Sequence, residues 1–421
     1  MDFNSAINRL YSLQKMGMKL GLDNIRSLMA YLGNPHESLK CFHIAGSNGK
    51  GSTASFMASI LMENGYKTGL YTSPHFIRYN ERIRINREEI PDNYVINFIG
   101  KIDRFISEQK STFFEVTTAL AFQYFADEKV DYAVIETGLG GRLDATNIIT
   151  PVASVITSIS FEHTEILGET IGDISAEKGG IIKSKSKVFL GRMPFKAKKV
   201  LSDIAETMGS ITYKVTDYIY LEENAVNFYS GNLTYKNVET PLKGIYQRYN
   251  AALAILTLSE TINLTNSTVV QNGIDKVVEN SGIQGRYEIF LTSPRVIFDS
   301  AHNFEGVNNF LNAFRDEASN YAKRILLFGV MKDKAIFQML EILSPYFDEI
   351  HFTSIEIDRA ATIADLSIIA DSLNIKYSVE KDGAVFIRST IKGNKNICLV
   401  VLGSMYVLGD IKKKLLTQKN T

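Results

Sequence analysis

The sequence contains few cysteines and no excess of charge of either sign. Its two cysteines, Cys41 and Cys398, lie in apolar, strand-like runs, which is typical of reduced core thiols and gives no support to a zinc site. The 46 Lys and Arg residues are balanced by 46 Asp and Glu residues, so no overall positive field is present to attract nucleic acid. The run Lys412–Lys414 is typical of a solvated helix face.

Membrane-spanning and targeting segments are also lacking. The longest apolar run consists of Ile397–Leu402 and its continuation, and it is too short to cross a bilayer. The N-terminal residues MDFNSAINRL do not have the layout of a signal peptide. No internal repeat or low-complexity tract is present. We therefore expect a cytoplasmic protein with no membrane partner.

The remaining composition is that of a globular α/β protein. The chain has 421 residues, of which 45% are hydrophobic, and is long enough for two or three domains. Strand-like runs alternate with helical ones, which predicts a mainly parallel sheet. The expected helices include Pro91–Gln109, Phe114–Asp127 and Gln247–Leu258.

Two changes of rhythm divide the chain. Residues 188–241 show short alternating runs, which predict a small β excursion at the edge of the first domain. The strand–helix alternation restarts at Val296, after the segment LTSPR. We therefore expect a first domain over residues 1–290, a linker over 291–295 and a second, smaller α/β domain over 296–421.

The central motif is the stretch CFHIAGSNGKGSTASFMASILMENG, residues 41–65. It reads as a buried strand, a glycine-rich turn and a helix. The N–H groups of such a turn, with the partial positive charge of the helix N-terminus, form an anion site, and Lys50 adds a mobile cation. Only two residues separate Gly46 from Gly49, whereas the standard P-loop has four between its first glycine and Gly-Lys. On spacing alone, this is either a phosphate-binding loop or an ordinary glycine-rich connection.

Three polar residues follow strands expected to neighbour this loop: Ser73, Glu136 and His163. Ligands gather at the carboxyl ends of parallel strands, so these side chains are candidates to hold one Mg²⁺ beside the phosphates. An imidazole is an unusual ligand for Mg²⁺, so His163 is the weakest member on chemistry alone. Each residue could instead have an ordinary structural role. Ser73 would be a turn hydroxyl, Glu136 a helix cap or ion-pair partner, and His163 a surface imidazole.

Other charged segments have two readings each. Residues 75–90 are rich in charge and contain Arg82, in either a basic loop beside the site or a solvated hairpin. The turn GLGGRLDATN places Asp144 near a ligand or is a tight strand–helix connection. In the second domain, Asp299 to Asn303 follow a strand, and Arg286 lies just before the domain boundary.

Ten segments, taken in order, resemble the motifs of the folylpolyglutamate synthase/dihydrofolate synthase family of the Mur-ligase superfamily. They are HIAGSNGKGST, TSPHF, NERIRIN, ETGLGGRLDATN, SISFEHTEILGETIGDISAEKGGIIK, QRYNAALAI, GRYE, FDSAHN, GVMKDK and GSMYVLGDIKK. The resemblance covers nearly the whole chain and includes the short spacing of the glycine-rich loop. It implies an N-terminal P-loop ATPase-like parallel-sheet domain, binding ATP and folate, and a smaller, Rossmann-like C-terminal glutamate-ligase domain.

The resemblance implies an ATP-dependent amide ligase that acts as a monomer on two small substrates, a reduced folate and L-glutamate. ATP phosphorylates a folate carboxylate, and the amine of L-glutamate then attacks the acyl phosphate. One alternative is another Mur-type ligase, which would usually carry a separate N-terminal substrate domain, whereas only about 40 residues precede the loop in this chain. Another is a P-loop nucleotide-binding module without ligase activity.

The resemblance also implies residue roles. ATP contacts are expected from Asn48, Gly49, Lys50, Gly51, Ser52, Asn250, Arg286 and Asp299. One Mg²⁺ is expected on Ser73, Glu136 and His163, and a second on a carbamylated Lys178. Catalytic roles are expected for Lys50, Lys178 and His302. Folate contacts are expected from Lys19, Leu20, Gly21, Leu22, Arg82, Phe113, Phe114, Glu115, Leu143, Asp144 and Ala145.

Two departures from the family pattern bear on these expectations. Lys19 stands where an acidic residue is often found, so dihydropteroate binding, and with it dihydrofolate synthase activity, is left open. Glu162 stands where Asp usually precedes the metal-site histidine. Neither change removes an expected metal ligand.

Overall fold

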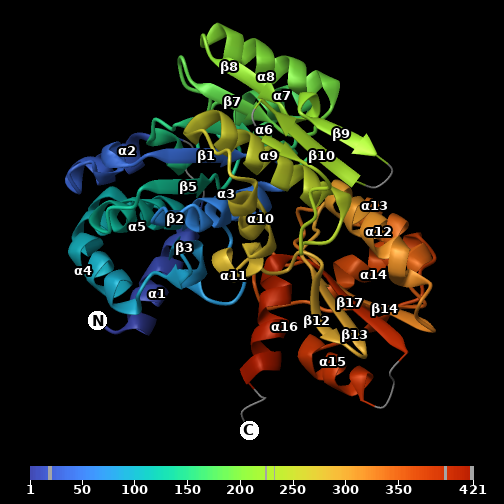
Figure 1. Cartoon of the computed structure of the whole chain (residues 1–421). Helices are drawn as coiled ribbons and strands as arrows, with labels where there is room; N and C mark the ends of the chain where they lie inside the picture. The colour runs from blue at the N-terminus through green and yellow to red at the C-terminus, as the bar shows by residue number, and fades with distance from the viewer. Residues whose placement is uncertain (18–20, 223–224, 232, 393–395, 418–421) are drawn as a thin grey trace. The chain divides into compact units, whose positions relative to one another are not determined.

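The computed structural model describes all residues except 18–20, 223–224, 232, 393–395 and 418–421 (Figure 1). The chain forms two compact units. The first comprises Met1–Pro241 and Gln247–Ile283, and the second comprises Leu242–Tyr246 and Gln284–Thr421. In the described part of the chain, no helix combines the length and the apolar character needed to cross a bilayer.

An eight-stranded sheet with the order β4-β3-β2-β5-β1-β6-β7-β8 is the framework of the first unit. The strands are β1 (Cys41–Ala45), β2 (Thr68–Tyr71), β3 (Ile83–Ile85), β4 (Glu88–Glu89), β5 (Tyr132–Glu136), β6 (Ala153–Ile156), β7 (Lys187–Leu190) and β8 (Ile211–Lys214). The run from β2 to β8 is parallel, whereas β3 and β4 are antiparallel. Every residue of β1 is buried, as expected for a parallel strand covered on both faces. The prediction of a mainly parallel α/β sheet is confirmed.

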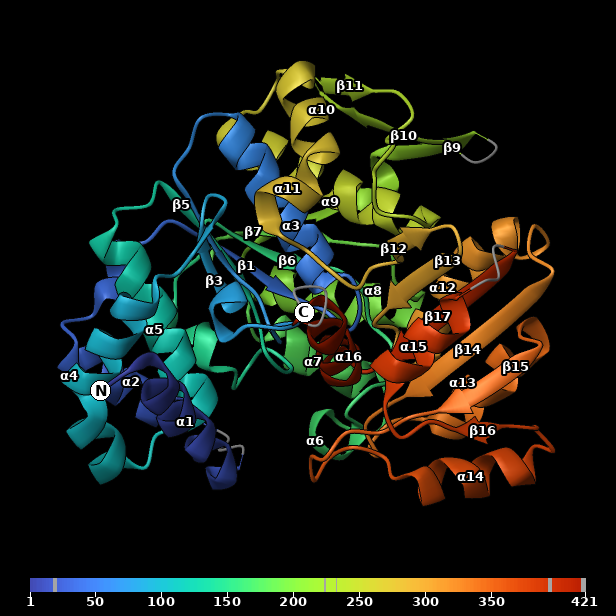
Figure 2. The same cartoon turned by 90° about the horizontal axis from the view of Figure 1, so that it is seen from below.

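Helix α3 is the element that follows the glycine-rich loop, and it runs through the interior of the first unit. All of its residues from Ser52 to Leu61 are buried, and α10 and α11 pack against it (Figures 1 and 2). A Cβ added at Gly273 of α10 would lie 2.6 Å from the Ile60 Cα, so the two helices meet backbone to backbone. The helices of this unit are α1 (Phe3–Ser12), α2 (Asp23–Tyr31), α3 (Lys50–Glu63), α4 (Asp92–Gln109), α5 (Phe113–Asp127), α6 (Thr164–Leu167), α7 (Ile171–Gly179), α8 (Phe195–Thr207), α9 (Ile245–Ile262), α10 (Ser267–Asp275) and α11 (Val277–Ser281).

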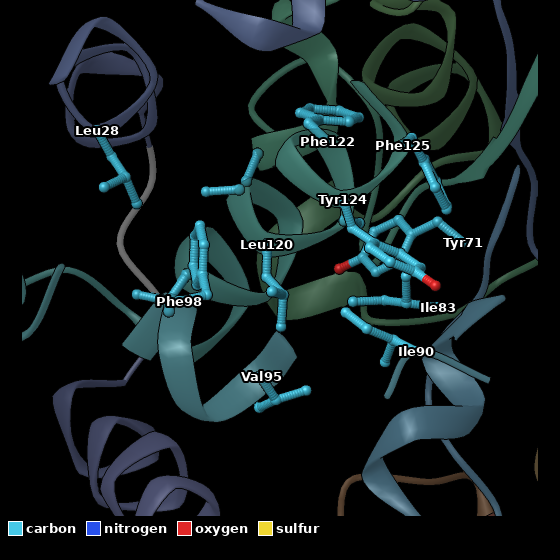
Figure 3. Close-up of a cluster of buried hydrophobic side chains, with 14 of the residues drawn as sticks. Leu28, Tyr71, Ile83, Ile90, Val95, Phe98, Leu120, Phe122, Tyr124 and Phe125 are labelled. Atoms are coloured by element: carbon cyan, nitrogen blue, oxygen red, sulfur yellow. The ribbon is translucent and has the colours of Figure 1, made fainter. Parts of the chain in front are cut away.

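A hydrophobic cluster joins α4 and α5 to one face of this sheet (Figure 3). Phe98 from α4 and Phe122 from α5 lie in this cluster with Tyr71 at the end of β2. A Cβ added at Gly69 would lie 2.9 Å from the Phe125 ring, which explains why β2 carries a glycine. This packing fixes the end of β2, from which Ser73 follows.

The predicted β excursion over residues 188–241 is present, but it covers only part of that segment. Strands β7 and β8 belong to the main sheet and pair in parallel, with α8 connecting them. A separate antiparallel sheet follows, made of β9 (Ile219–Glu222), β10 (Ala225–Ser230) and β11 (Leu233–Tyr235). Short apolar runs look alike in both settings, because strand pairing is decided by tertiary contacts that the local pattern does not contain.

The second unit carries a six-stranded sheet with the order β12-β13-β17-β14-β15-β16 (Figure 2). Its strands are β12 (Glu288–Thr292), β13 (Arg295–Asp299), β14 (Lys323–Gly329), β15 (Glu349–Phe352), β16 (Ser378–Val379) and β17 (Ile397–Gly403). Its helices are α12 (Phe304–Ala318), α13 (Ile336–Leu343), α14 (Ile363–Ser372), α15 (Gly383–Ile391) and α16 (Met405–Thr417). All pairs are parallel except β12–β13. The predicted restart of strand–helix alternation is confirmed.

The division between the units lies earlier than the segment predicted as a linker. Residues 291–295 form the turn of the β12–β13 hairpin, in which Thr292 pairs with Arg295. The chain instead passes into the second unit between Ile283 and Gln284. Ser293-Pro294 resembles a linker in composition, but a hairpin turn uses the same residue types.

Candidate functional site

The glycine-rich loop connects β1 to α3, and two of its glycines are required by close approach. Gly46 (φ 151°) would place a Cβ 2.0 Å from the Thr157 Oγ1. Gly49 has a left-handed φ of 85° and would place a Cβ 2.6 Å from the Asn250 Oδ1. Only glycine fits both positions without strain. The strand–turn–helix context is therefore confirmed. Asn250 of α9 lies against the loop, and its contact with ATP stays a prediction.

Hydroxyl groups that follow β6 fix the position of Asn48. The Asn48 N–H donates to the Ser158 Oγ at 3.0 Å, and its carbonyl accepts from the Thr157 Oγ1 at 2.6 Å. The first N–H groups of α3 lack partners within the helix, so the N–H groups of Gly49 to Ser52, rather than that of Asn48, are suited to an anion. Sequence reasoning missed both hydroxyls, although a Ser/Thr-rich run after a strand at this sheet edge was a usable signal.

Two lysines meet at one carbonyl oxygen of this loop. The Lys50 Nζ donates to the Gly46 oxygen at 2.9 Å, and the Lys178 Nζ donates to the same oxygen at 3.0 Å. Lys178 is only 1% exposed, and its Nζ also lies 2.7 Å from the Glu162 Oε1. Residues 132 positions apart are thus brought together beside the loop.

The charges in this cluster do not cancel. Burial raises the pKa of the Glu162 carboxyl, but the charges of Lys178 and Lys50 outweigh burial and lower that pKa to about 2. Burial lowers the pKa of the Lys178 ammonium, while its ion pair with Glu162 opposes that shift. One carboxylate thus faces two basic groups, so the loop carries a local excess of positive charge that favours an anionic ligand.

Two of the three predicted Mg²⁺ ligands lie together. The Ser73 N–H donates to the Glu136 Oε2 at 2.9 Å, and Glu136, at the end of β5, is 4% exposed. His163 lies in the segment after β6, directly before α6, with a left-handed φ of 45°. Within the described residues, no cluster of three or more His, Cys, Asp and Glu side chains could hold a metal ion. This finding does not test the trio, because one of its members is a serine.

Two acidic residues expected near folate are engaged by their own chain. Asp144 accepts from the backbone N–H groups of Gly138 and Leu139 and from both donors of Thr146. Burial raises the pKa of Asp144, and these hydrogen bonds oppose the increase. Glu115 accepts from both donors of Thr112 at the start of α5. The structure thus shows each carboxylate holding a turn or a helix cap, and folate contact by either remains a prediction.

The other expected folate contacts come from four segments. Lys19 and Leu20 lie outside the described residues, while Gly21 and Leu22 directly precede α2. A Cβ added at Gly138 would lie 2.4 Å from the Phe114 ring, so Phe114 packs on the glycine turn. Phe113 lies under the Arg82 guanidinium at 5.3 Å. Leu143 is half-buried and Ala145 is buried, on either side of Asp144.

The predicted residues of the second unit gather at the end of β13. Asp299 accepts from the N–H groups of Tyr287 and Ala301, at 2.7 and 2.8 Å, and burial raises its pKa to about 6. Arg286 donates to the Ser300 hydroxyl. The His302 Nδ1 lies 2.8 Å from the Ser300 carbonyl oxygen, and since a carbonyl only accepts, Nδ1 carries a proton.

Comparison with known proteins agrees with this geometry. Residues 44–258 match the Mur ligase middle domain, and residues 285–405 match the Mur ligase glutamate ligase domain. A Bacillus subtilis dihydrofolate synthase/folylpolyglutamate synthase is 34% identical over 98% of this chain and 99% of its own length. A Lacticaseibacillus casei folylpolyglutamate synthase is 30% identical over the full length of both chains. The structure of E. coli FolC in complex with DHPP and ADP has a TM-score of 0.89 and 28% identity, covering 100% of this chain and 99% of that one. This chain belongs to the folylpolyglutamate synthase/dihydrofolate synthase family of Mur-type ligases.

Proposed function

We propose that this protein is an ATP-dependent ligase that adds L-glutamate to a reduced folate, releasing ADP and phosphate. The observation that carries the proposal is the convergence of Lys50 and Lys178 on the Gly46 carbonyl, beside a helix N-terminus. Two relatives that match this chain over nearly its full length support the proposal. One is named folylpolyglutamate synthase, and the other is named dihydrofolate synthase/folylpolyglutamate synthase. We assign ATP and folate binding to the first unit and glutamate ligation to the second, which matches the glutamate ligase domain.

The loop suits the polyphosphate of ATP. The N–H groups at the start of α3 and the helix dipole favour phosphate oxygens. A Lys50 ammonium that now bonds a neutral carbonyl would gain an ion pair with an anionic oxygen by turning to a terminal phosphate. Preorganised cations and N–H groups of this kind stabilise the charge that develops during phosphoryl transfer. The acceptor is a folate carboxylate, which becomes an acyl phosphate, and the amine of L-glutamate then displaces phosphate.

The donor set fits Mg²⁺. Ser73 and Glu136 supply a hydroxyl and a carboxylate at adjacent strand ends, the oxygen donors that this ion prefers, and we assign His163 as the third ligand. Bound there, Mg²⁺ would neutralise charge on the phosphate oxygens.

Carbamylation would replace the Lys178 ammonium with a carboxylate-like end next to Glu162, and two such groups suit a second Mg²⁺. In that form the positive charge beside the loop would come from Lys50 and the metal ion, and Lys178 would act as a cation only before carbamylation. Labelling with ¹³C-bicarbonate tests this, since a carbamate signal that persists in Lys178→Met excludes Lys178.

The second unit supplies the remaining assignments. We assign nucleotide contacts to Arg286 and Asp299, and a role near the transferred phosphoryl group to His302, whose protonated Nδ1 is held by the Ser300 carbonyl. Asn250 contacts ATP from the first unit, where it already lies against Gly49. The proposal treats the protein as a monomer, which light scattering during gel filtration tests.

Dihydrofolate synthesis is a second candidate reaction. The Bacillus subtilis relative, 34% identical to this chain, is named for both activities. The chemistry is the same, since dihydropteroate also presents a carboxylate to be activated. A side-by-side assay with dihydropteroate and tetrahydrofolate separates one activity from two.

The decisive test is a product analysis. Incubation with MgATP, L-glutamate and tetrahydrofolate should give ADP and a folate longer by one glutamate, in equal amounts. Omission of either L-glutamate or tetrahydrofolate should abolish ADP formation above background. ATP binding without glutamate-dependent turnover would instead indicate a nucleotide-binding module, and turnover with a different acceptor would indicate another Mur-type ligase.

A further inference from the structure

Arg82 is a buried arginine whose hydrogen-bonded partner is neutral. It ends the turn before β3 and is 4% exposed, and its Nε donates to the His75 Nδ1 at 2.8 Å. An arginine side chain only donates, so His75 Nδ1 carries no proton there. Burial and the nearby charge of Arg82 lower the pKa of His75 to about 3, which keeps the imidazole uncharged. The guanidinium charge is therefore not neutralised by His75.

Within the described part of the chain, no carboxylate forms an ion pair with Arg82. Its chain neighbour Glu81 accepts from the backbone N–H groups of residues 76–78. Glu115, two residues beyond the Phe113 that Arg82 stacks on, caps α5 through Thr112. The next arginine, Arg84, forms an ion pair with Glu89 at 2.9 Å. Arg84 thus has a carboxylate partner of the kind that Arg82 lacks among the described residues. A buried charge without a counter-charge is costly, which indicates a site completed by an anion.

Aromatic rings hold the guanidinium in place. Its central carbon lies 5.3 Å from the centre of the Phe113 ring. Tyr11 stacks on Phe113 at 5.9 Å, and Tyr79 meets the same ring edge-on at 6.1 Å. The Tyr11 hydroxyl also contacts the His75 Nε2 at 3.3 Å. This arrangement orients a planar fork of donors before any ligand arrives, as bidentate carboxylate recognition requires.

The cluster borders the residues assigned to Mg²⁺. The Arg82 carbonyl accepts from the Thr72 N–H at 3.0 Å, and Thr72 directly precedes Ser73. Ser73 in turn donates to Glu136. Arg82 is thus anchored at the same strand end where the folate carboxylate is to be activated.

We propose that Arg82 binds the non-reacting carboxylate of the terminal glutamate of the folate substrate. This inference rests on the proposed function. The terminal glutamate carries two carboxylates; one is converted to an acyl phosphate, and the other stays ionised throughout and needs a fixed cation. Arg82 supplies that cation next to the reaction site, and the Phe113 and Tyr11 rings hold it in place.

The test compares two substrates in three proteins. The substrates are tetrahydrofolate and an analogue in which the non-reacting carboxylate is a carboxamide. The proteins are the wild type, Arg82→Gln and the control Arg84→Gln, which removes an arginine on the adjacent strand that already has a carboxylate partner. A charge-assisted bidentate contact predicts that the wild type and Arg84→Gln prefer the acid by about tenfold or more in kcat/KM, and that Arg82→Gln loses this preference.

The ratio of acid to amide isolates the contact from any general loss of folded protein. Should Arg82→Gln fail to fold, Arg82→Lys, which retains the charge, should keep a reduced preference for the acid. An equal preference for the acid in the wild type and Arg82→Gln, or in the wild type and an Arg82→Ala protein, overturns the proposal. A wild type that ligates glutamate to neither substrate overturns the proposed function itself and is thereby distinguishable.

Discussion

Lys50 and Lys178 donate to the same carbonyl oxygen, that of Gly46, at 2.9 and 3.0 Å. One lysine begins the helix after the glycine-rich loop, and the other lies near the end of α7. Two basic groups on one neutral acceptor, with a single carboxylate from Glu162, leave the loop electrostatically prepared for a polyphosphate. The relationship joins the loop proposed to bind the nucleotide to the segment that carries the proposed carbamate.

Replacing Lys50 should abolish catalysis without unfolding the protein. Lys50→Met removes a cation from the transferring phosphate, and losses of about 100-fold or more in kcat are typical when one such electrostatic contact is removed. The melting temperature should change little, because Lys50 is only partly buried and its hydrogen bonds go to the backbone carbonyls of Gly46 and Ser47. Lys199→Met, at an exposed position on α8, is the control and should keep wild-type kcat.

Breaking the buried Lys178–Glu162 pair should destabilise the fold. Lys178→Met leaves the Glu162 carboxylate largely buried without its partner, at a cost of about 3 kcal/mol in the free energy of unfolding at pH 7. The double variant Lys178→Met/Glu162→Gln removes both charges and should recover most of that loss. Urea denaturation of the two variants checks this, and equal stability of the single and double variants would show that the pair is not coupled.

Replacing His163 should reduce turnover and leave the fold intact. His163→Ala removes one of three assigned Mg²⁺ ligands from a half-buried position. We expect the loss of most activity at ordinary Mg²⁺ concentrations, with partial recovery at high Mg²⁺. Kinetics across a Mg²⁺ titration measure both effects, and unchanged activity at low Mg²⁺ would remove His163 from the ligand set.

Asp299 should make the fold less stable as the pH rises. Burial raises its pKa to about 6 from an ordinary value of 3.8, so between these pH values the folded protein binds more protons than the unfolded chain. The free energy of unfolding contributed by this group therefore falls as the pH increases from about 4 to 6, by about 3 kcal/mol in all. Asp299→Asn should flatten the dependence of the free energy of unfolding on pH in this window. Denaturation measured at several pH values checks this, and an unchanged pH dependence would contradict the assignment.

The sequence predicted local features well. The strand, loop and helix over residues 41–65 follow from an apolar run, glycines and a helical period, all within 25 residues, and the structure has them at those positions. The placement of Ser73 beside Glu136 was predicted from the rule that ligands gather at the carboxyl ends of parallel strands.

Features that depend on distant segments were not predicted from the residues alone. The contact between Lys178 and Gly46 spans 132 positions, and no local pattern encodes it. The same holds for the hydroxyls of Thr157 and Ser158 on Asn48, and for the parallel pairing of β7 with β8. Two readings were open for Asp144, a position near a ligand or a tight strand–helix connection. Its four hydrogen bonds show that it forms the turn, and its contact with folate stays a prediction.

An isotope-transfer measurement tests the central claim most directly. With ¹⁸O in the reacting carboxylate of tetrahydrofolate, the oxygen that attacks the terminal phosphorus of ATP should leave with phosphate when L-glutamate forms the amide. Phosphorus NMR should then show one ¹⁸O in each inorganic phosphate released. Unlabelled phosphate formed together with the glutamylated product would contradict an acyl phosphate, and with it the proposed role of the Lys50–Lys178 cluster.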